Sequence, residues 1–310
     1  MRFEKVAEIV FSYYGQEKYS EALEVVKKAM KEYPEKEHRT AYWAACLYAK
    51  SNDYKSAINV LRECFHKGFW WAPAMLTKDP DLAPLYDNDE FKQLVSECNI
   101  VYKKVQAETK PELLIKIPKN YYENKHYPLM VVLHWRGGNV KDFSKHWNIP
   151  VLRDNYILAF PQSSQVLGME SYCWDNIEIA KQEILTHYNN IINEYKIDIN
   201  QIIIAGASQG GRLSIDLALE ENIFHGFIAA IPALSDIDYY IKLKDNWKYE
   251  KGVIITGDKD YYYQKTKQFY SIFKELNYPI KLIVEKELGH TLSENFSNHI
   301  KKSIEFINET

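Results

Sequence analysis

The sequence predicts an α/β protein, in which helices cover both faces of a mostly parallel sheet and an all-helical domain comes first. Up to about residue 95 the apolar residues follow a helical pattern, and part of this stretch is an internal repeat. After Lys104, short apolar runs alternate with helical stretches, which is typical of parallel strands joined by helices. We therefore expect a helical domain over residues 1–105 and an α/β domain over residues 106–310.

The composition is that of an ordinary globular protein. The chain has 310 residues, of which 46% are hydrophobic and 26% charged, enough apolar side chains for a sizeable core. A net charge of −3 gives no reason to expect nucleic acid or an anionic membrane as a partner. No run approaches the ~18 apolar residues of a membrane span, and the first residues do not resemble a signal peptide. We therefore expect a cytoplasmic protein with reduced cysteines.

The helical domain contains a repeat with an offset of 35 residues. Tyr13, Tyr19, Ala22, Val26 and Ala29 recur as Tyr48, Tyr54, Ala57, Leu61 and Cys64. The small residues let two helices approach closely, and Pro34 ends the first unit because proline cannot continue a helix. The pattern resembles tetratricopeptide repeats, whose period is about 34 residues. The resemblance implies a structural cap on the neighbouring domain, a dimer surface, a peptide-binding surface or a lid.

Seven apolar runs after Lys104 are candidate strands. They are Glu112–Pro118, Leu129–Leu133, Ile157–Phe160, Ile202–Ala205, Phe227–Ile231, Val253–Thr256 and Ile280–Val284. The first alternates apolar and polar residues and predicts an edge strand, whereas the others are mostly apolar, and Ile202–Ala205 in particular is typical of a strand buried on both faces. In such sheets functional residues follow the carboxyl ends of the strands.

The fourth of these runs leads directly into Gly206-Ala-Ser208-Gln-Gly210, and a helical pattern follows. A strand, G-x-S-x-G and a helix together predict a sharp turn that exposes the serine hydroxyl above the sheet. Glycines at these positions fit because such a turn leaves no room for larger side chains. The N-terminus of the following helix offers backbone N–H groups to a developing oxyanion. Ser208 is therefore a candidate nucleophile.

Asp260 and His290 each come shortly after a later candidate strand. The order Ser208, Asp260, His290 is that of α/β-hydrolases and differs from other serine-hydrolase folds. Residues 110–310 resemble an α/β-hydrolase of the carboxylesterase/phospholipase and dienelactone-hydrolase type. The resemblance implies a Ser-His-Asp triad, with Asp260 favoured as the acid because it lies three residues after a strand-ending glycine. Asp258 remains the alternative acid.

The resemblance also implies an oxyanion site made of two backbone N–H groups, those of Gln209 and Arg136. Arg136 lies in His134-Trp-Arg-Gly-Gly, where related families place a structural histidine at the first position. Trp135 stands where the family pattern has glycine, so it either restricts the backbone or forms a wall of the acyl pocket. Trp135, Trp174 and Tyr261 are the candidate residues of a substrate pocket.

The expected function is hydrolysis of a small-molecule carboxylic ester through an acyl-enzyme. A thioesterase or a peptidase with the same triad remains open, as does a repeat-based binding protein with an inactive hydrolase domain. The sequence contains no metal-ligand spacing and no phosphate-binding glycine loop, so we expect neither a metal nor an organic cofactor. The helical repeats are a candidate surface for a protein or peptide.

Overall fold

The computed structural model describes residues 3–243, 247 and 251–309. Its internal contacts divide the chain into two units. The first, here called the helical unit, consists of Met1–Thr109 and Val166–Ser171. The second, here called the sheet unit, consists of Lys110–Gln165 and Tyr172–Thr310.

The division differs from the single boundary expected near residue 105. Helix α6 (Asp89–Glu108) runs through that position without interruption, so the first crossing between the units comes after the helix ends. The segment Val166–Ser171 also belongs to the helical unit. Within this unit, the Ala72 N–H donates to the Leu167 carbonyl at 2.8 Å. Such long-range pairing leaves no local composition signal in the sequence.

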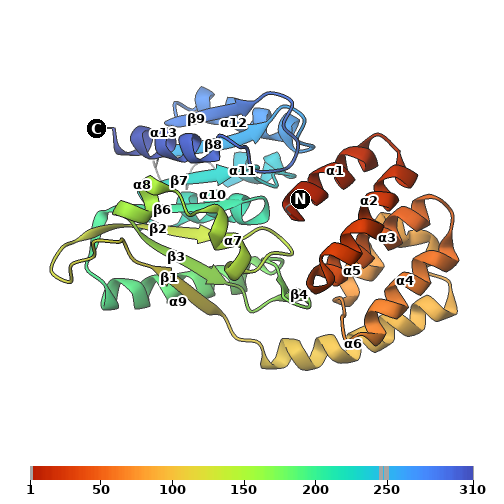
Figure 1. Cartoon of the computed structure of the whole chain (residues 1–310). Helices are drawn as coiled ribbons and strands as arrows, with labels where there is room; N and C mark the ends of the chain where they lie inside the picture. The colour runs from red at the N-terminus through yellow and green to blue at the C-terminus, as the bar shows by residue number, and fades with distance from the viewer. Residues whose placement is uncertain (1–2, 244–246, 248–250, 310) are drawn as a thin grey trace. The chain divides into compact units, whose positions relative to one another are not determined.

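Apart from the short strand β4 (Val166–Gly168) and Ser171, the first residue of the two-residue strand β5 (Ser171–Tyr172), the regular elements described in the helical unit are helices (Figure 1). They are α1 (Phe3–Gly15), α2 (Tyr19–Glu32), the 3₁₀ helix η1 (Pro34–Lys36), α3 (Glu37–Lys50), α4 (Tyr54–His66), α5 (Pro73–Lys78), the 3₁₀ helix η2 (Pro80–Leu85) and α6. The repeated small positions Ala22 and Ala29 on α2, with Ala57 and Cys64 on α4, are all buried. The likeness to tetratricopeptide repeats stays a prediction.

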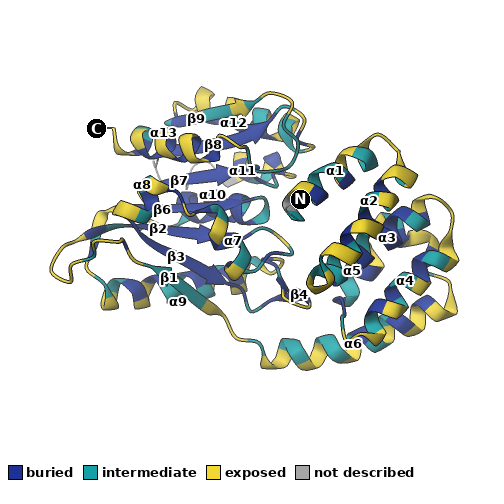
Figure 2. Cartoon of the chain, viewed as in Figure 1, coloured by how far each residue is buried: buried dark blue, intermediate teal, exposed yellow. Residues whose placement is uncertain are grey.

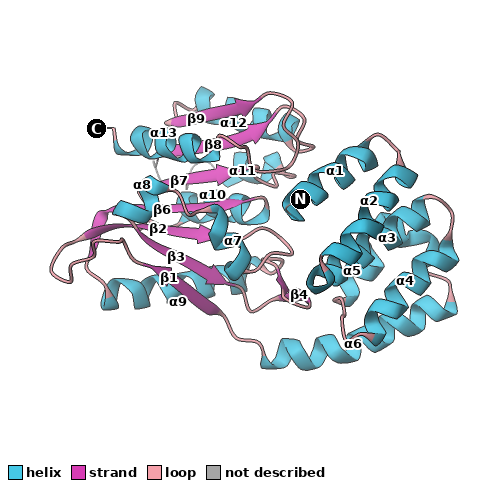
Figure 3. Ribbon diagram, viewed as in Figure 1, coloured by secondary structure: helices cyan, strands magenta, loops and turns pink. Residues whose placement is uncertain are grey.

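The sheet unit is built on a seven-stranded sheet with the order β1-β3-β2-β6-β7-β8-β9 (Figure 3). Its strands are β1 (Glu112–Lys116), β2 (Tyr127–Leu133), β3 (Ile157–Gln162), β6 (Ile197–Ala207), β7 (Gly226–Ala230), β8 (Lys251–Gly257) and β9 (Ile280–Glu285). Strand β1 pairs antiparallel with β3 at one edge, and the remaining pairs are parallel. The predicted mostly parallel sheet is therefore confirmed.

Two apolar layers cover the sheet, one on each face. One layer contains residues of α9 (Ile177–Glu194), α10 (Gln209–Glu220), α11 (Ile237–Leu243) and α12 (Tyr263–Glu275). The other contains residues of α7 (Val140–His146), α8 (Pro150–Asn155) and α13 (Phe296–Asn308). Figure 2 shows the buried strands between helices whose outer surfaces are exposed.

The central strand β6 shows how the sequence produces these layers. Ile202 and Ile204 face the first layer, whereas Ile203 and Ala205 face the second. Successive side chains of a strand point to opposite faces, so the part of β6 that is covered on both sides is an apolar run. This apolar run ends at the serine turn.

Candidate active site

The polar loops singled out in the sequence follow strands β2, β6, β8 and β9. These strands are parallel, so their carboxyl ends meet at one edge of the sheet. His134 follows β2, Ser208 follows β6, Asp260 follows β8 and His290 follows β9. Residues far apart in the sequence are thereby brought together.

The turn at Ser208 has the strained backbone that its glycines predict. Ser208 adopts φ 53° and ψ −117°, a conformation that costs a non-glycine residue energy and is concentrated at functional sites. A Cβ on Gly206 would lie 2.4 Å from the Gly210 carbonyl oxygen. A Cβ on Gly210 would lie 2.3 Å from the Leu133 oxygen. Both glycines are required because backbone passes too close for any side chain.

A chain of hydrogen bonds links Ser208, His290 and Asp260. His290 Nε2 lies 2.9 Å from Ser208 Oγ, and His290 Nδ1 lies 2.8 Å from Asp260 Oδ2. The Asp260 side chain has no exposed surface, and its other oxygen accepts the Tyr262 N–H at 2.8 Å. Because both of its oxygens accept hydrogen bonds, the Asp260 carboxylate is held in one orientation. It favours a proton on His290 Nδ1, which leaves His290 Nε2 free to accept the Ser208 hydroxyl.

Asp258, the alternative acid, lies elsewhere in the same loop. Its Oδ1 accepts the Glu287 N–H at 2.7 Å, so Asp258 stabilises the loop between β9 and His290. Gly257 allows this close packing, because a Cβ there would lie 1.9 Å from the Leu288 oxygen. The loops that carry Asp260 and His290 are thus held directly against each other.

His134 is a buried anchor beneath this site. Its Nδ1 lies 2.9 Å from the Trp135 carbonyl oxygen, and its Nε2 lies 3.5 Å from the Ser163 N–H. Burial lowers the pKa of His134 to about 4, which keeps the ring neutral so that it can accept on one nitrogen and donate on the other.

Trp174 is a correction to the expected pocket residues. Its side chain is fully buried, its ring stacks on His134 at 4.6 Å, and its Nε1–H donates to the His134 carbonyl at 2.9 Å. A side chain without exposed surface cannot line an open substrate pocket. Trp174 therefore packs against the buried His134 ring and does not line a substrate pocket.

Trp135 does not impose the backbone restriction that its replacement of glycine suggested. The left-handed conformation in this loop falls at Gly137, with φ 79°. The Trp135 ring packs edge-on against Phe143 at 4.8 Å. It also occupies the space beside Gly138, where a Cβ would lie 2.8 Å from its Cδ1. The indole is accommodated by the two glycines that follow it.

The side chains of both predicted oxyanion residues meet at Asp175, a residue not singled out from the sequence. Arg136 donates to both carboxylate oxygens of Asp175, at 3.1 and 3.0 Å, and Gln209 Nε2 donates to one of them at 2.8 Å. Partial burial alone would raise the pKa of Asp175, but these hydrogen bonds lower it overall. A lone aspartate after an aromatic residue carries no motif that could have identified it.

Tyr261, the remaining candidate pocket residue, lies beside the histidine. Its side chain is 72% exposed, and its ring centroid lies 4.5 Å from that of His290. Tyr262 approaches the same histidine at 5.5 Å. The two tyrosines therefore flank His290, and Tyr261 presents apolar surface to solvent there.

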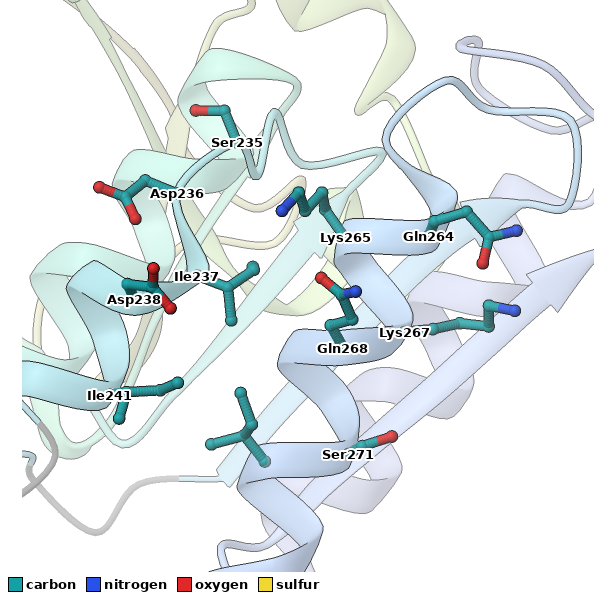
Figure 4. Close-up of a pocket in the computed structure, with 11 residues that line it drawn as sticks. Ser235, Asp236, Ile237, Asp238, Ile241, Gln264, Lys265, Lys267, Gln268 and Ser271 are labelled. Atoms are coloured by element: carbon teal, nitrogen blue, oxygen red, sulfur yellow. The ribbon is translucent and has the colours of Figure 1, made fainter.

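A hollow of about 810 Å³ lies between α11 and α12 (Figure 4). In Figure 4, Lys265 and Gln268 extend from α12 toward Ile237 on α11. Ser208, Asp260 and His290 are not among its lining residues. The hollow is thus a feature separate from the linked side chains.

Among the described residues, Cys46, Asp79 and Asp81 of the helical unit form a cluster with the donor types of a metal site. Protein donors already reach these carboxylates. The Tyr14 hydroxyl donates to Asp81 at 2.7 Å and the Tyr42 hydroxyl donates to Asp79 at 2.6 Å. The cluster is therefore a hydrogen-bonded network that joins α1, α3 and η2.

No helix in the described part of the chain is long and apolar enough to cross a membrane.

Comparison with known proteins identifies the fold. Residues 3–106 match the family described as A/B hydrolase-like, N-terminal domain, and no curated protein matches the chain. The solved structure of an uncharacterized protein from Bacillus cereus ATCC 10987 is similar over 99% of each chain, with 26% identity and a TM-score of 0.56.

Two solved esterases are similar over 64% of this chain. Esterase PE8 is covered over 99% of its length, with 17% identity and a TM-score of 0.53. A ferulic acid esterase is covered over 98%, with 17% identity and a TM-score of 0.51. Together with the strand order and the parallel pairing, these likenesses show that this part of the chain shares the fold of the two esterases.

Proposed function

We propose that this protein is a serine hydrolase that cleaves a carboxylic ester through an acyl-enzyme. In this proposal Ser208 is the nucleophile, His290 the general base and Asp260 the acid that orients the base. The observation that carries the proposal is the continuous hydrogen-bond chain between them, with distances of 2.9 and 2.8 Å. A nucleophile within reach of a base, itself held by a third group, is the arrangement that activates a serine.

The reaction follows from these contacts. His290 Nε2 takes the Ser208 Oγ proton while Oγ attacks the ester carbonyl carbon. When the tetrahedral intermediate collapses, the bond to the alcohol oxygen breaks and the alcohol leaves with the proton from Nε2. Water then repeats the sequence on the acyl-enzyme, which releases the acid and returns the proton to Ser208.

The charge that develops on the carbonyl oxygen needs preorganised donors. Gln209 is the first residue of α10, so its N–H has no intrahelical acceptor and points with the positive end of the helix dipole. We assign the second donor to the backbone N–H of Arg136, in the loop after β2. Trp135 and Tyr261 are proposed as apolar contacts of the substrate.

An ester is favoured as the substrate because the solved structures that share the fold include esterase PE8 and a ferulic acid esterase. A thioester or a peptide bond can react at the same side chains. A binding protein with an inactive sheet unit is disfavoured by the intact Ser208–His290–Asp260 contacts. The strained backbone at Ser208 also disfavours it, because such strain costs energy and is concentrated at functional sites.

The test is a panel of p-nitrophenyl esters of increasing acyl length, assayed beside a thioester and a peptide amide of matched acyl group. The proposal predicts the highest kcat/KM on one of the esters and complete loss in the Ser208→Ala variant. Greater activity on the thioester or the amide would reassign the reaction class. Absence of turnover on every substrate, with the protein folded, would favour the binding protein.

A further inference from the structure

The segment Tyr172–Asp175 is fastened to the loop that carries Arg136. The Gly137 N–H donates to the Tyr172 carbonyl at 2.8 Å, and the Tyr172 N–H donates to the Gly138 carbonyl at 3.0 Å. The indole N–H of Trp174 adds a hydrogen bond to the same loop at 2.9 Å. The backbone on both sides of Arg136 is therefore tied to this one segment.

The same segment is fastened to the residue after the serine. The Trp174 backbone N–H donates to Gln209 Oε1 at 2.8 Å, and Gln209 Nε2 donates to Asp175 Oδ1 at 2.8 Å. Asp175 also receives the Arg136 guanidinium through both of its oxygens. Its carboxylate thus joins the side chains of the two residues to which the oxyanion donors are assigned.

We propose that Asp175 is a positioning residue for the oxyanion site, which fixes the separation and direction of the Gln209 and Arg136 backbone N–H groups. This inference rests on the proposed function. Donors stabilise a transition state most when they are held in place before charge develops, and a bidentate carboxylate–guanidinium contact supplies that constraint. Asp175 acts through these two residues and does not itself touch the reacting atoms.

The exposure of the pair predicts a specific pattern of effects. The Arg136 and Asp175 side chains are 43% and 45% exposed, and ion pairs this exposed contribute little to global stability. A change at Asp175 should therefore leave the melting temperature nearly unchanged. Its effect should fall on kcat, because the oxyanion exists only in the transition state and the intermediates.

The chain contains a matched control. Arg153 and Asp154 on α8 form a similar contact, with distances of 2.9 and 3.3 Å and side chains 38% and 47% exposed. Asp175→Ala, Asp175→Asn and Asp154→Ala should be compared on the best ester of the panel. Rates should be expressed per active serine, counted by titration with a fluorophosphonate, so that misfolded protein does not enter the comparison.

We expect Asp175→Ala to lower kcat about 10- to 100-fold, less than the loss of a whole oxyanion donor, while KM stays within about twofold. Asp175→Asn should fall between this variant and the wild type, because an amide can still accept from Gln209 but loses the charge. Affinity for a trifluoromethyl ketone, whose adduct carries the oxyanion, should fall by the same factor as kcat/KM. Asp154→Ala should change none of these.

A kcat per active serine within twofold of wild type in Asp175→Ala would overturn the inference. So would an equal loss in Asp154→Ala, or a loss explained by a lower melting temperature and fewer titratable serines. Each of these results leaves the proposed hydrolysis standing, because the wild type would still be active. If the wild type itself neither turns over nor reacts with the fluorophosphonate, the proposed function and this inference both fail.

Discussion

Replacing Asp260 with asparagine is the sharpest change of a single atom at this site. The carboxylate uses one oxygen for His290 Nδ1 and the other for the Tyr262 N–H, both at 2.8 Å. Asparagine has only one oxygen. If that oxygen keeps the Tyr262 N–H, the amide NH₂ faces His290 and donates to Nδ1. The imidazole proton then moves to Nε2, which can no longer accept the proton of Ser208.

The magnitude follows from this change of tautomer. In serine proteases, loss of the correct tautomer costs about 10⁴-fold in kcat. We expect about 10³- to 10⁴-fold for Asp260→Asn, which corresponds to about 4–5 kcal/mol of transition-state stabilisation. Asp258→Asn should cost far less, because the Asp258 carboxylate serves the Glu287 N–H and not the histidine.

The assay is kcat and KM for both variants on the preferred ester, with melting temperatures measured alongside. Both variants keep side-chain shape, so the comparison isolates proton position from packing. Greater damage from Asp258→Asn, or a kcat for Asp260→Asn within tenfold of wild type, would refute the assignment of Asp260.

Three further predictions concern the rest of the structure. Gly210→Ala should destabilise the protein by about 3 kcal/mol or more, since the new Cβ would collide with backbone oxygens at 2.3 and 2.5 Å; urea unfolding measures this. His38 and His134 have pKa values lowered by burial from 6.5 to about 4. Below about pH 6.5 the unfolded chain therefore binds more protons than the folded protein does. Stability should be retained above about pH 6.5 and drop by about 2 kcal/mol for each histidine between pH 7 and pH 5, and an unfolding free energy that does not change over this range would contradict it. The fragment 106–310 should melt below the whole chain, because residues 166–171 lose the helical unit in which they pack; an unchanged melting temperature would show that this packing is dispensable.

Much of the sheet unit could be predicted because its signals are local. Apolar runs of strand length become β2, β3, β6, β7, β8 and β9, and β1 lies at the predicted edge. The strand-end rule then places Ser208, Asp260 and His290 at one edge before any contact is known. The structure places Asp260 Oδ2 2.8 Å from His290 Nδ1, and the role of Asp260 as the acid stays a prediction.

Other features depend on contacts between distant segments and leave no sequence pattern. Nothing local distinguishes an aromatic that packs on a buried histidine, as Trp174 does, from one that lines a pocket. Asp175 becomes notable only when Arg136 and Gln209 are seen to converge on it. The assignment of residues 166–171 to the helical unit likewise rests on long-range pairing. The roles of the helical unit as a cap or a peptide-binding surface remain proposals.

The most direct test of the central claim is to identify the residue that a fluorophosphonate modifies. Only a serine activated by a neighbouring base should react quickly. We predict modification of Ser208 alone, located by mass spectrometry of proteolytic peptides, and no modification in a folded Ser208→Ala variant. Ser163, which is fully buried, and Ser164, whose hydroxyl donates to Glu183, serve as internal controls. Modification at either of these serines, or an unmodified Ser208 in the folded wild type, would contradict the account.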